Sequence, residues 1–234
     1  MEELLFDRIR MKISDAQFRV STDSMVLADF CRIKSGSRVL DLGCGCGTLG
    51  LLLLGADGTL HVSGIEIQEA AARQAQENAE ENGFSDHLHI VCGDLRQTHA
   101  EIAPGGFDCV LSNPPYYPPK SGHLHTQDSL SAARSEICCP FDALCAAAAR
   151  ALRWGGRFFL VHKPERLVDL MTGLRAARLE PKRIRFVRHR AGSSVNFVLI
   201  ESEAHARVLR RDLVLYTQTG ELSAAGRRIY HLQE

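Results

Sequence analysis

The chain has 234 residues, of which 45% are hydrophobic and 24% are charged, and its formal net charge is zero. These values are typical of a folded globular domain and exclude collagen, coiled-coil and intrinsically disordered chains. A zero net charge also excludes a globally basic nucleic-acid binder, although a basic surface can still form locally.

The predicted elements alternate between helix and strand after residue 22, and residues 1–22 show no clear period. The first group comprises a helix at 24–30 preceded by Thr22 and Asp23 as its cap, a strand at 38–42, a helix at 48–54, a strand at 60–67, a helix at 69–82 ended by Gly83, and strands at 87–92 and 107–112. The second group comprises a polar loop at 118–135, a helix at 141–152, a strand at 157–162, a helix at 165–177, and strands at 182–188 and 195–201.

This alternation is typical of an α/β fold with a mainly parallel sheet. Residues 189–194 are too few for a crossover helix, so the last two strands are expected to be antiparallel neighbours. We expect one domain, with an N-terminal extension and helix at 1–36, a core sheet at 37–201 and a C-terminal extension at 202–234.

The cellular compartment is predicted from the cysteines and the apolar runs. The eight cysteines include no CxxC pair, which argues for reduced thiols and against a zinc site. The first residues lack the apolar core of a signal peptide, and the run LGLLLLGA is far shorter than the roughly 20 residues that span a bilayer. We expect a cytoplasmic protein with no metal and no membrane contact.

Two strand ends carry residues suited to holding a small ligand. After the strand at 38–42, Gly43, Gly45 and Gly47 allow sharp turns and close approach of the backbone to a ligand. Glu66 ends the strand at 60–67, where a carboxylate can accept both hydroxyls of a ribose. Its alternative role is to favour the start of the next helix through the helix dipole.

Two further strand ends carry Asp94 and the motif NPPY. Asp94 could accept from an exocyclic amine, or it could cap the next helix. In the motif, Asn113 offers a side-chain carbonyl, Pro114 a backbone carbonyl and Tyr116 an aromatic face. Two acceptors and a stacking surface fit a planar group with an exocyclic NH₂.

The ordered set DLGCGCG, GIEI, GD and NPPY resembles the class I S-adenosylmethionine-dependent methyltransferases of the NPPY type. The flanking segments STDSMVLADF and LEPKRIRFVRHRAGSSVNFVLIE are similar to those of the tRNA1(Val) adenine-37 N6-methyltransferases, so the resemblance covers nearly the whole chain. It implies a Rossmann-like fold with a mainly parallel seven-stranded sheet, its last strand antiparallel, and helices on both faces.

The resemblance also implies S-adenosyl-L-methionine as cofactor and an adenine of the tRNA anticodon loop as acceptor. It assigns the methionine part of the cofactor to Asp41, Gly43, Gly45 and Gly47, the ribose to Glu66, the cofactor adenine to Asp94 and Leu95, and the target base to Asn113, Pro114 and Tyr116.

The motif NPPY alone does not select among planar NH₂ acceptors. A protein-glutamine N5-methyltransferase acting on release factors is one alternative, although such enzymes usually carry a separate N-terminal helical domain. Guanine-N2 methylation of ribosomal RNA and DNA adenine methylation are others. A non-catalytic binding module with the same fold is the alternative of a different class, and the four intact motifs argue against it.

A basic C-terminal third points to a polyanionic partner. Residues 175–211 contain ten Lys and Arg but three acidic residues, although solvated faces of ordinary elements would look the same. Lys120 and Arg134 in the polar loop are further candidates for phosphate contacts. The expected oligomeric state is a monomer or a weak homodimer.

Overall fold

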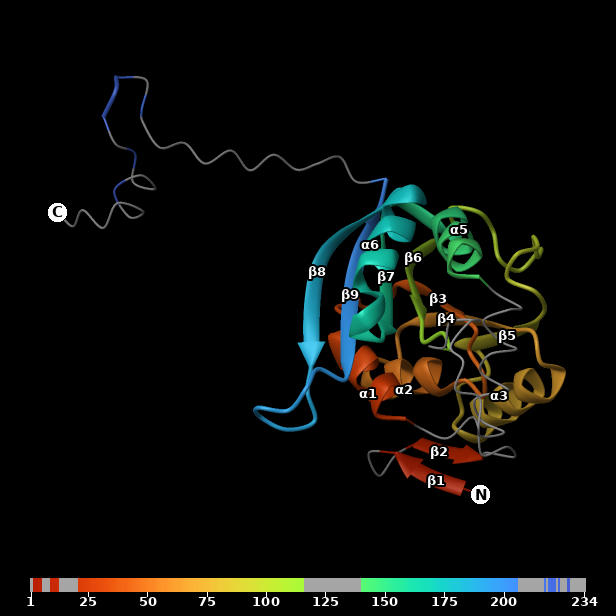
Figure 1. Ribbon diagram of the computed structural model, residues 1–234. Helices are drawn as coiled ribbons and strands as arrows, with labels where there is room; N and C mark the ends of the chain where they lie inside the picture. The colour runs from red at the N-terminus through yellow and green to blue at the C-terminus, as the bar shows by residue number, and fades with distance from the viewer. Residues whose placement is uncertain are drawn as a thin grey trace.

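The computed structural model describes residues 2–5, 9–12, 21–115 and 140–205, and the shorter stretches 217, 219–221, 223 and 227. A seven-stranded sheet in the order β5-β4-β3-β6-β7-β9-β8 forms its centre (Figure 1). The strands are β3 (Arg38–Leu42), β4 (His61–Glu66), β5 (Leu88–Cys92), β6 (Phe107–Ser112), β7 (Leu152–His162), β8 (Leu179–Val187) and β9 (Phe197–Ala204).

The sheet is parallel except at its last strand. The pairs β3–β4, β3–β6, β4–β5 and β6–β7 are parallel, whereas β9 is antiparallel to both β7 and β8. The predicted fold class is therefore confirmed, including the short connection between the last two strands. Because six strands run the same way, their last residues share one edge of the sheet, which we call the carboxyl edge, and their first residues share the opposite amino edge.

Helices cover both faces of the sheet because successive strand residues point to opposite sides. Val39 belongs to one apolar core and Leu40 to the other. The first core includes α1 (Thr22–Phe30), α2 (Thr48–Ala56) and α3 (Glu69–Glu81), and the second includes α5 (Phe141–Ala151) and α6 (Leu167–Ala176). A short 3₁₀ turn, η2 (Pro164–Arg166), precedes α6. Within the described residues, no helix is both long and apolar enough to cross a membrane.

An antiparallel hairpin at the N-terminus is the main element that the sequence pattern did not predict. It pairs β1 (Glu2–Leu5) with β2 (Ile9–Lys12), and Figure 1 shows it beneath α2 and α3. Ile9 and Met11 are buried in the first core while Arg10 and Lys12 are exposed. Gly55 of α2 makes this possible, because a Cβ atom there would lie 2.3 Å from Cδ1 of Ile9.

Several other predicted boundaries were wrong, among them those of the last two strands, which lie at 179–187 and 197–204. The first helix begins at Thr22 with Ser21 as its N-cap, so Thr22 and Asp23 lie inside it. The strand predicted at 157–162 begins at Leu152 and continues through two glycines. The helix predicted at 165–177 is divided into a 3₁₀ turn and α6.

Candidate functional site

The glycine-rich loop after β3 is fastened to the end of β4. The backbone amides of Gly43 and Cys44 donate to the carbonyl oxygen of Ile65, at 2.9 and 3.1 Å. The amide of Gly45 donates to Oε2 of Glu66 at 3.0 Å. The three predicted glycines all have positive φ, of 76°, 55° and 84° along the chain, which favours glycine at each. The structure therefore brings the predicted glycines and Glu66 together at the carboxyl edge.

Glu66 is bound by backbone amides on both sides. Its Oε2 atom accepts from the glycine-rich loop, and Oε1 accepts from the amide of Gln68, the N-cap of α3, at 2.9 Å. The carboxylate is 6% exposed. The contact with Gln68 bears out the predicted role at the helix start. A role toward a ribose stays a prediction.

Asp41 lies inside the site with its carboxylate unsatisfied. Among the described residues, neither of its buried oxygens has a hydrogen-bond partner. Burial, with a smaller contribution from the nearby charge of Glu66, raises the pKa of Asp41 to about 8. A buried carboxylate without donors fits a ligand that brings N–H donors or positive charge, as the ammonium and sulfonium groups of S-adenosylmethionine would.

Asp94 is placed next to this site, but its side chain has local partners. The amide of Gly93 donates to the carbonyl oxygen of Glu66 at 2.8 Å, which holds the two strand ends together. Oδ1 of Asp94 accepts from the amide of Arg96 at 2.9 Å, and the Arg96 guanidinium bonds both carboxylate oxygens. These hydrogen bonds from Arg96 lower the pKa of Asp94. The predicted alternative of a helix cap is wrong, because residues 93–106 contain no helix and Asp94 stabilises a turn instead. Contact of Asp94 and of the half-buried Leu95 with the cofactor adenine stays a prediction.

The start of the NPPY motif is fixed from two directions. The Ser112 hydroxyl donates to the carbonyl oxygen of Leu42 at 2.7 Å and joins the ends of β6 and β3. Nδ2 of Asn113 donates to Oγ of Ser24 at 3.0 Å, and Ser24 lies in the first turn of α1. Asn113 and Pro114 are half-buried, as suits residues that meet a ligand.

Ser24 belongs to this site, although the sequence pattern did not indicate it. It is 89 residues from Asn113, and its Oγ also lies 3.2 Å from Oγ of Ser21. The side chains of Ser21, Ser24 and Asn113 therefore form a chain of hydrogen bonds from the start of α1 to the motif. The predicted residues Tyr116, Lys120 and Arg134 lie outside the described residues.

The basic residues of the C-terminal third lie at both edges of the sheet and within β8, where Arg183 pairs with Glu201 and Arg185 with Asp29. Arg175 and Arg178 lie at the amino edge, and Arg175 forms an ion pair with Glu180. Arg188 and Arg190 lie at the carboxyl edge, in the 188–196 loop between β8 and β9. Val187 of β8 pairs with the first residue of β9, which fixes this loop beside the end of β7. The structure does not describe Arg207, Arg210 and Arg211.

The 188–196 loop holds its shape through its own hydrogen bonds. The amide and hydroxyl of Ser193 donate to the carbonyl oxygen of Arg190, and the Arg188 guanidinium donates to the carbonyl oxygen of Ser193. Within the described part of the chain, neither arginine of the loop forms an ion pair with a carboxylate. Two exposed cations thus lie at the carboxyl edge, and no carboxylate among the described residues pairs with them.

The family model of the methyltransferase small domain matches residues 16–172. The chain belongs to this methyltransferase family. The family assignment agrees with the arrangement at the carboxyl edge, where glycine loop, acidic residues and the start of NPPY converge.

Among its relatives is the tRNA1(Val) (adenine(37)-N6)-methyltransferase of Dickeya chrysanthemi, 33% identical over 61% of this chain and 56% of the relative. The protein of the same name from Porphyromonas gingivalis is 32% identical over 78% of this chain and 73% of the relative. This methyltransferase chain therefore spans between about half and three quarters of the length of these curated relatives. A predicted O-methyltransferase from Agrobacterium tumefaciens shares the fold, with a TM-score of 0.64 and 18% identity over 90% of this chain and 96% of that one.

Proposed function

We propose that this protein transfers a methyl group from S-adenosyl-L-methionine to N6 of an adenine in tRNA, at A37 of tRNA1(Val). The observation that carries the proposal is the junction at the carboxyl edge, where Asn113 is held by Ser24 and joined through Ser112 to the start of the glycine-rich loop. The names of the relatives support the choice of tRNA as acceptor.

The residues around the glycine-rich loop hold the cofactor in this proposal. Asp41 faces the positively charged methionine part, Gly43, Gly45 and Gly47 let the backbone approach it, and Glu66 accepts from the ribose hydroxyls through its remaining lone pairs. Asp94 and Leu95 border the adenine, and Asp94 then shares its oxygens with Arg96. The unsatisfied carboxylate of Asp41 is the observation that supports a cationic ligand.

Asn113, Pro114 and Tyr116 hold the target base. When bound, S-adenosyl-L-methionine would supply the methyl group and leave as a neutral thioether, and N6 would lose one of its two protons to solvent. The lone pair of N6 is delocalised into the ring, so N6 is a weak nucleophile. Accepting the two N6 hydrogens through Oδ1 of Asn113 and the carbonyl of Pro114 directs the lone pair toward the methyl group, and Tyr116 stacks on the base.

The RNA backbone crosses the carboxyl edge. Arg188 and Arg190 are exposed there without carboxylate partners in the described structure, and they contact phosphates together with Lys120 and Arg134. Phosphate contacts of this kind set register on the RNA and carry no base specificity. The protein acts as a single methyltransferase domain in the cytoplasm, as a monomer or weak homodimer.

Methyl transfer from labelled cofactor to two substrates in parallel tests the proposal. One substrate is unmodified tRNA and the other is an unmodified release factor, with nucleoside and peptide mass analysis of the products. N6-methyladenosine in the tRNA is the expected product. N5-methylglutamine in the release factor would move the acceptor to a protein amide, and no transfer to either substrate would contradict the proposed activity.

A further inference from the structure

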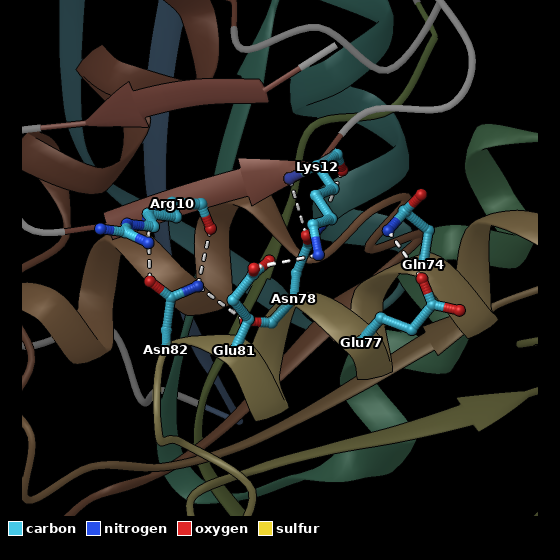
Figure 2. Close-up of polar contacts among 7 residues, drawn as sticks. All are labelled: Arg10, Lys12, Gln74, Glu77, Asn78, Glu81 and Asn82. Atoms are coloured by element: carbon cyan, nitrogen blue, oxygen red, sulfur yellow. Dashed lines mark hydrogen bonds and ion pairs between the residues drawn. The ribbon is translucent and has the colours of Figure 1, made fainter.

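Asn78 of α3 and Asn82, the C-cap residue of that helix, bind the backbone of β2 in the same way (Figure 2). Oδ1 of Asn78 accepts from the amide of Lys12 at 2.8 Å, and its Nδ2 donates to the carbonyl of Lys12 at 3.1 Å. Asn82 makes the equivalent pair with the amide and carbonyl of Arg10, at 2.8 and 2.7 Å. Four helix residues rise about 6 Å and two strand residues about 6.7 Å, so the spacings match. The two side-chain amides thus pair with the backbone of β2 as a neighbouring strand would, and they attach the hairpin to α3.

Asn78 and Asn82 differ in the partner of the second Nδ2 hydrogen. Asn82 donates it to the carbonyl oxygen of Asn78 at 2.7 Å, whereas Asn78 donates it to the carbonyl oxygen of Cys46 at 3.1 Å, inside the glycine-rich loop. Asn78 is fully buried, and Cys46 precedes Gly47, the N-cap of α2, so its carbonyl stands outside the regular helix pattern. A buried carbonyl needs such a donor, because leaving it unpaired is costly. Asn78 therefore joins three segments: α3, β2 and the loop.

The same face of α3 also packs against the loop. A Cβ atom on Gly47 would lie 3.3 Å from Cβ of Ala75, one helical turn before Asn78. Gly47 has a φ of 84°, and its amide donates to the carbonyl of Cys44 at 2.9 Å. Because a peptide unit is planar, holding the Cys46 carbonyl toward α3 fixes which way the Gly47 amide points. Asn78 thus sets the orientation of a peptide unit in the loop.

We propose that Asn78 is a positioning residue for the cofactor, which holds the glycine-rich loop in its binding conformation and links that loop to the N-terminal hairpin. The inference rests on the proposed function in one respect, that the loop receives S-adenosylmethionine. Both hydrogens of the Asn78 amide are used, one on Lys12 and one on Cys46, so seating β2 against α3 orients the donor that Cys46 receives. The hairpin is in this way connected to the cofactor site through Asn78, without touching the cofactor.

The test compares Asn78→Ala with Asn82→Ala, using calorimetric titration of the full chain with S-adenosyl-L-homocysteine. Both variants remove two hydrogen bonds to the backbone of β2. Asn78→Ala also removes the contact with Cys46, whereas Asn82→Ala also removes the bond to the Asn78 carbonyl. We expect the Kd to rise about tenfold in Asn78→Ala and to stay within about twofold in Asn82→Ala. Ile9→Ala, which weakens the hairpin through its apolar contacts alone, is a second control and should also stay within about twofold.

Two further measurements separate positioning from general destabilisation. Asn78→Asp keeps an acceptor for the Lys12 amide but removes the donor to Cys46, so it should raise the Kd at least as much as Asn78→Ala. For tRNA methylation, Asn78→Ala should raise the KM for the cofactor while kcat and the KM for tRNA stay within about twofold. Equal Kd values for Asn78→Ala and Asn82→Ala would overturn the proposal.

Amide hydrogen exchange keeps the inference separate from the proposed function. Asn78→Ala should speed exchange at Lys12 and at Gly47, whereas Asn82→Ala should speed it at Arg10 alone. If the unmutated protein binds no S-adenosyl-L-homocysteine, the proposed cofactor is wrong, and the exchange comparison still decides whether Asn78 holds the loop. Unchanged exchange at Gly47 in Asn78→Ala would overturn the inference.

Discussion

At the amino edge of the sheet, Asp57 accepts hydrogen bonds from Ser35 and Thr59, whereas at the carboxyl edge both oxygens of Asp41 are buried without a partner among the described residues. The pKa values follow this difference. The hydroxyl of Ser35 lowers the pKa of Asp57, and burial raises that of Asp41 to about 8. A carboxylate such as Asp57, whose hydrogen bonds are made to nearby residues, stabilises the fold. A buried carboxylate such as Asp41, without a hydrogen-bond partner among the described residues, is suited to binding a ligand. Asp94 is the exception at the carboxyl edge, because Arg96 bonds it.

The largest expected effect at the carboxyl edge comes from Asn113→Ala. Removing the acceptor for an N6 hydrogen should lower kcat for tRNA methylation about 10²- to 10³-fold, because this interaction acts on the reacting nitrogen. Affinity for S-adenosyl-L-homocysteine should stay within about twofold. A variant with unchanged kcat would remove Asn113 from the base-holding group.

Asp41→Asn should weaken cofactor binding about 10- to 100-fold, since a buried charge–charge contact is lost. A cationic ligand favours the ionised carboxylate, so the affinity of the unmutated protein should rise as the pH rises from about 6 toward the pKa of about 8. This pH dependence should be absent in Asp41→Asn. Calorimetry across that range measures both effects.

Without cofactor, the same group has the opposite consequence for stability. The pKa of Asp41 is higher in the folded protein than in the unfolded chain, so its contribution is present at low pH and is lost as the pH rises from about 4 to about 8. Asp41→Asn should therefore show a flatter dependence of Tm on pH. A Tm that falls equally with pH in both proteins would contradict the raised pKa.

Ser24→Ala should lower kcat about tenfold, because the Asn113 amide loses the acceptor that orients it. Ser24→Thr keeps the hydroxyl and should recover most of the activity. Cofactor affinity should be unchanged in both variants. Equal losses in the alanine and threonine variants would mean that Ser24 acts through packing and not through its hydroxyl.

Arg188 and Arg190 allow a direct comparison of the two edges. The double alanine variant should lower the slope of log K for tRNA binding against log salt by about one unit per residue, with no change in the methylated base. Arg175 and Arg178 at the amino edge provide the control, because their double alanine variant changes the charge equally. Equal changes in slope for both arginine pairs would contradict phosphate binding by Arg188 and Arg190 at the carboxyl edge.

The smallest catalytic effect is expected at the amino edge. Asp57→Ala should lower Tm, since it removes the acceptor for Ser35 and Thr59, and should leave kcat within about twofold. Because the pKa of Asp57 is lowered in the folded protein, its contribution to stability is present at neutral pH and is lost on acidification. A clear loss of kcat would contradict the claim that Asp57 stabilises the fold without contributing to the site.

The sequence predicted those parts of the protein that local pattern determines. The strands at 38–42 and 107–112 matched their bounds, since short apolar runs end there at glycine or proline. The hairpin could not be predicted, because Ile9 and Met11 are buried by α2 and α3 and its backbone bonds go to Asn78, 66 residues away from Lys12. The contact between Ser24 and Asn113 is equally nonlocal. Motifs located the site, and tertiary contacts determine how it is held.

Methylation of two tRNA1(Val) transcripts tests the central claim most directly. One transcript carries A37 and the other carries G37, and both are incubated with the unmutated protein and labelled S-adenosyl-L-methionine. The account predicts one N6-methyladenosine per A37 transcript and none in the G37 transcript. Equal incorporation into both transcripts, or none into either, would contradict it.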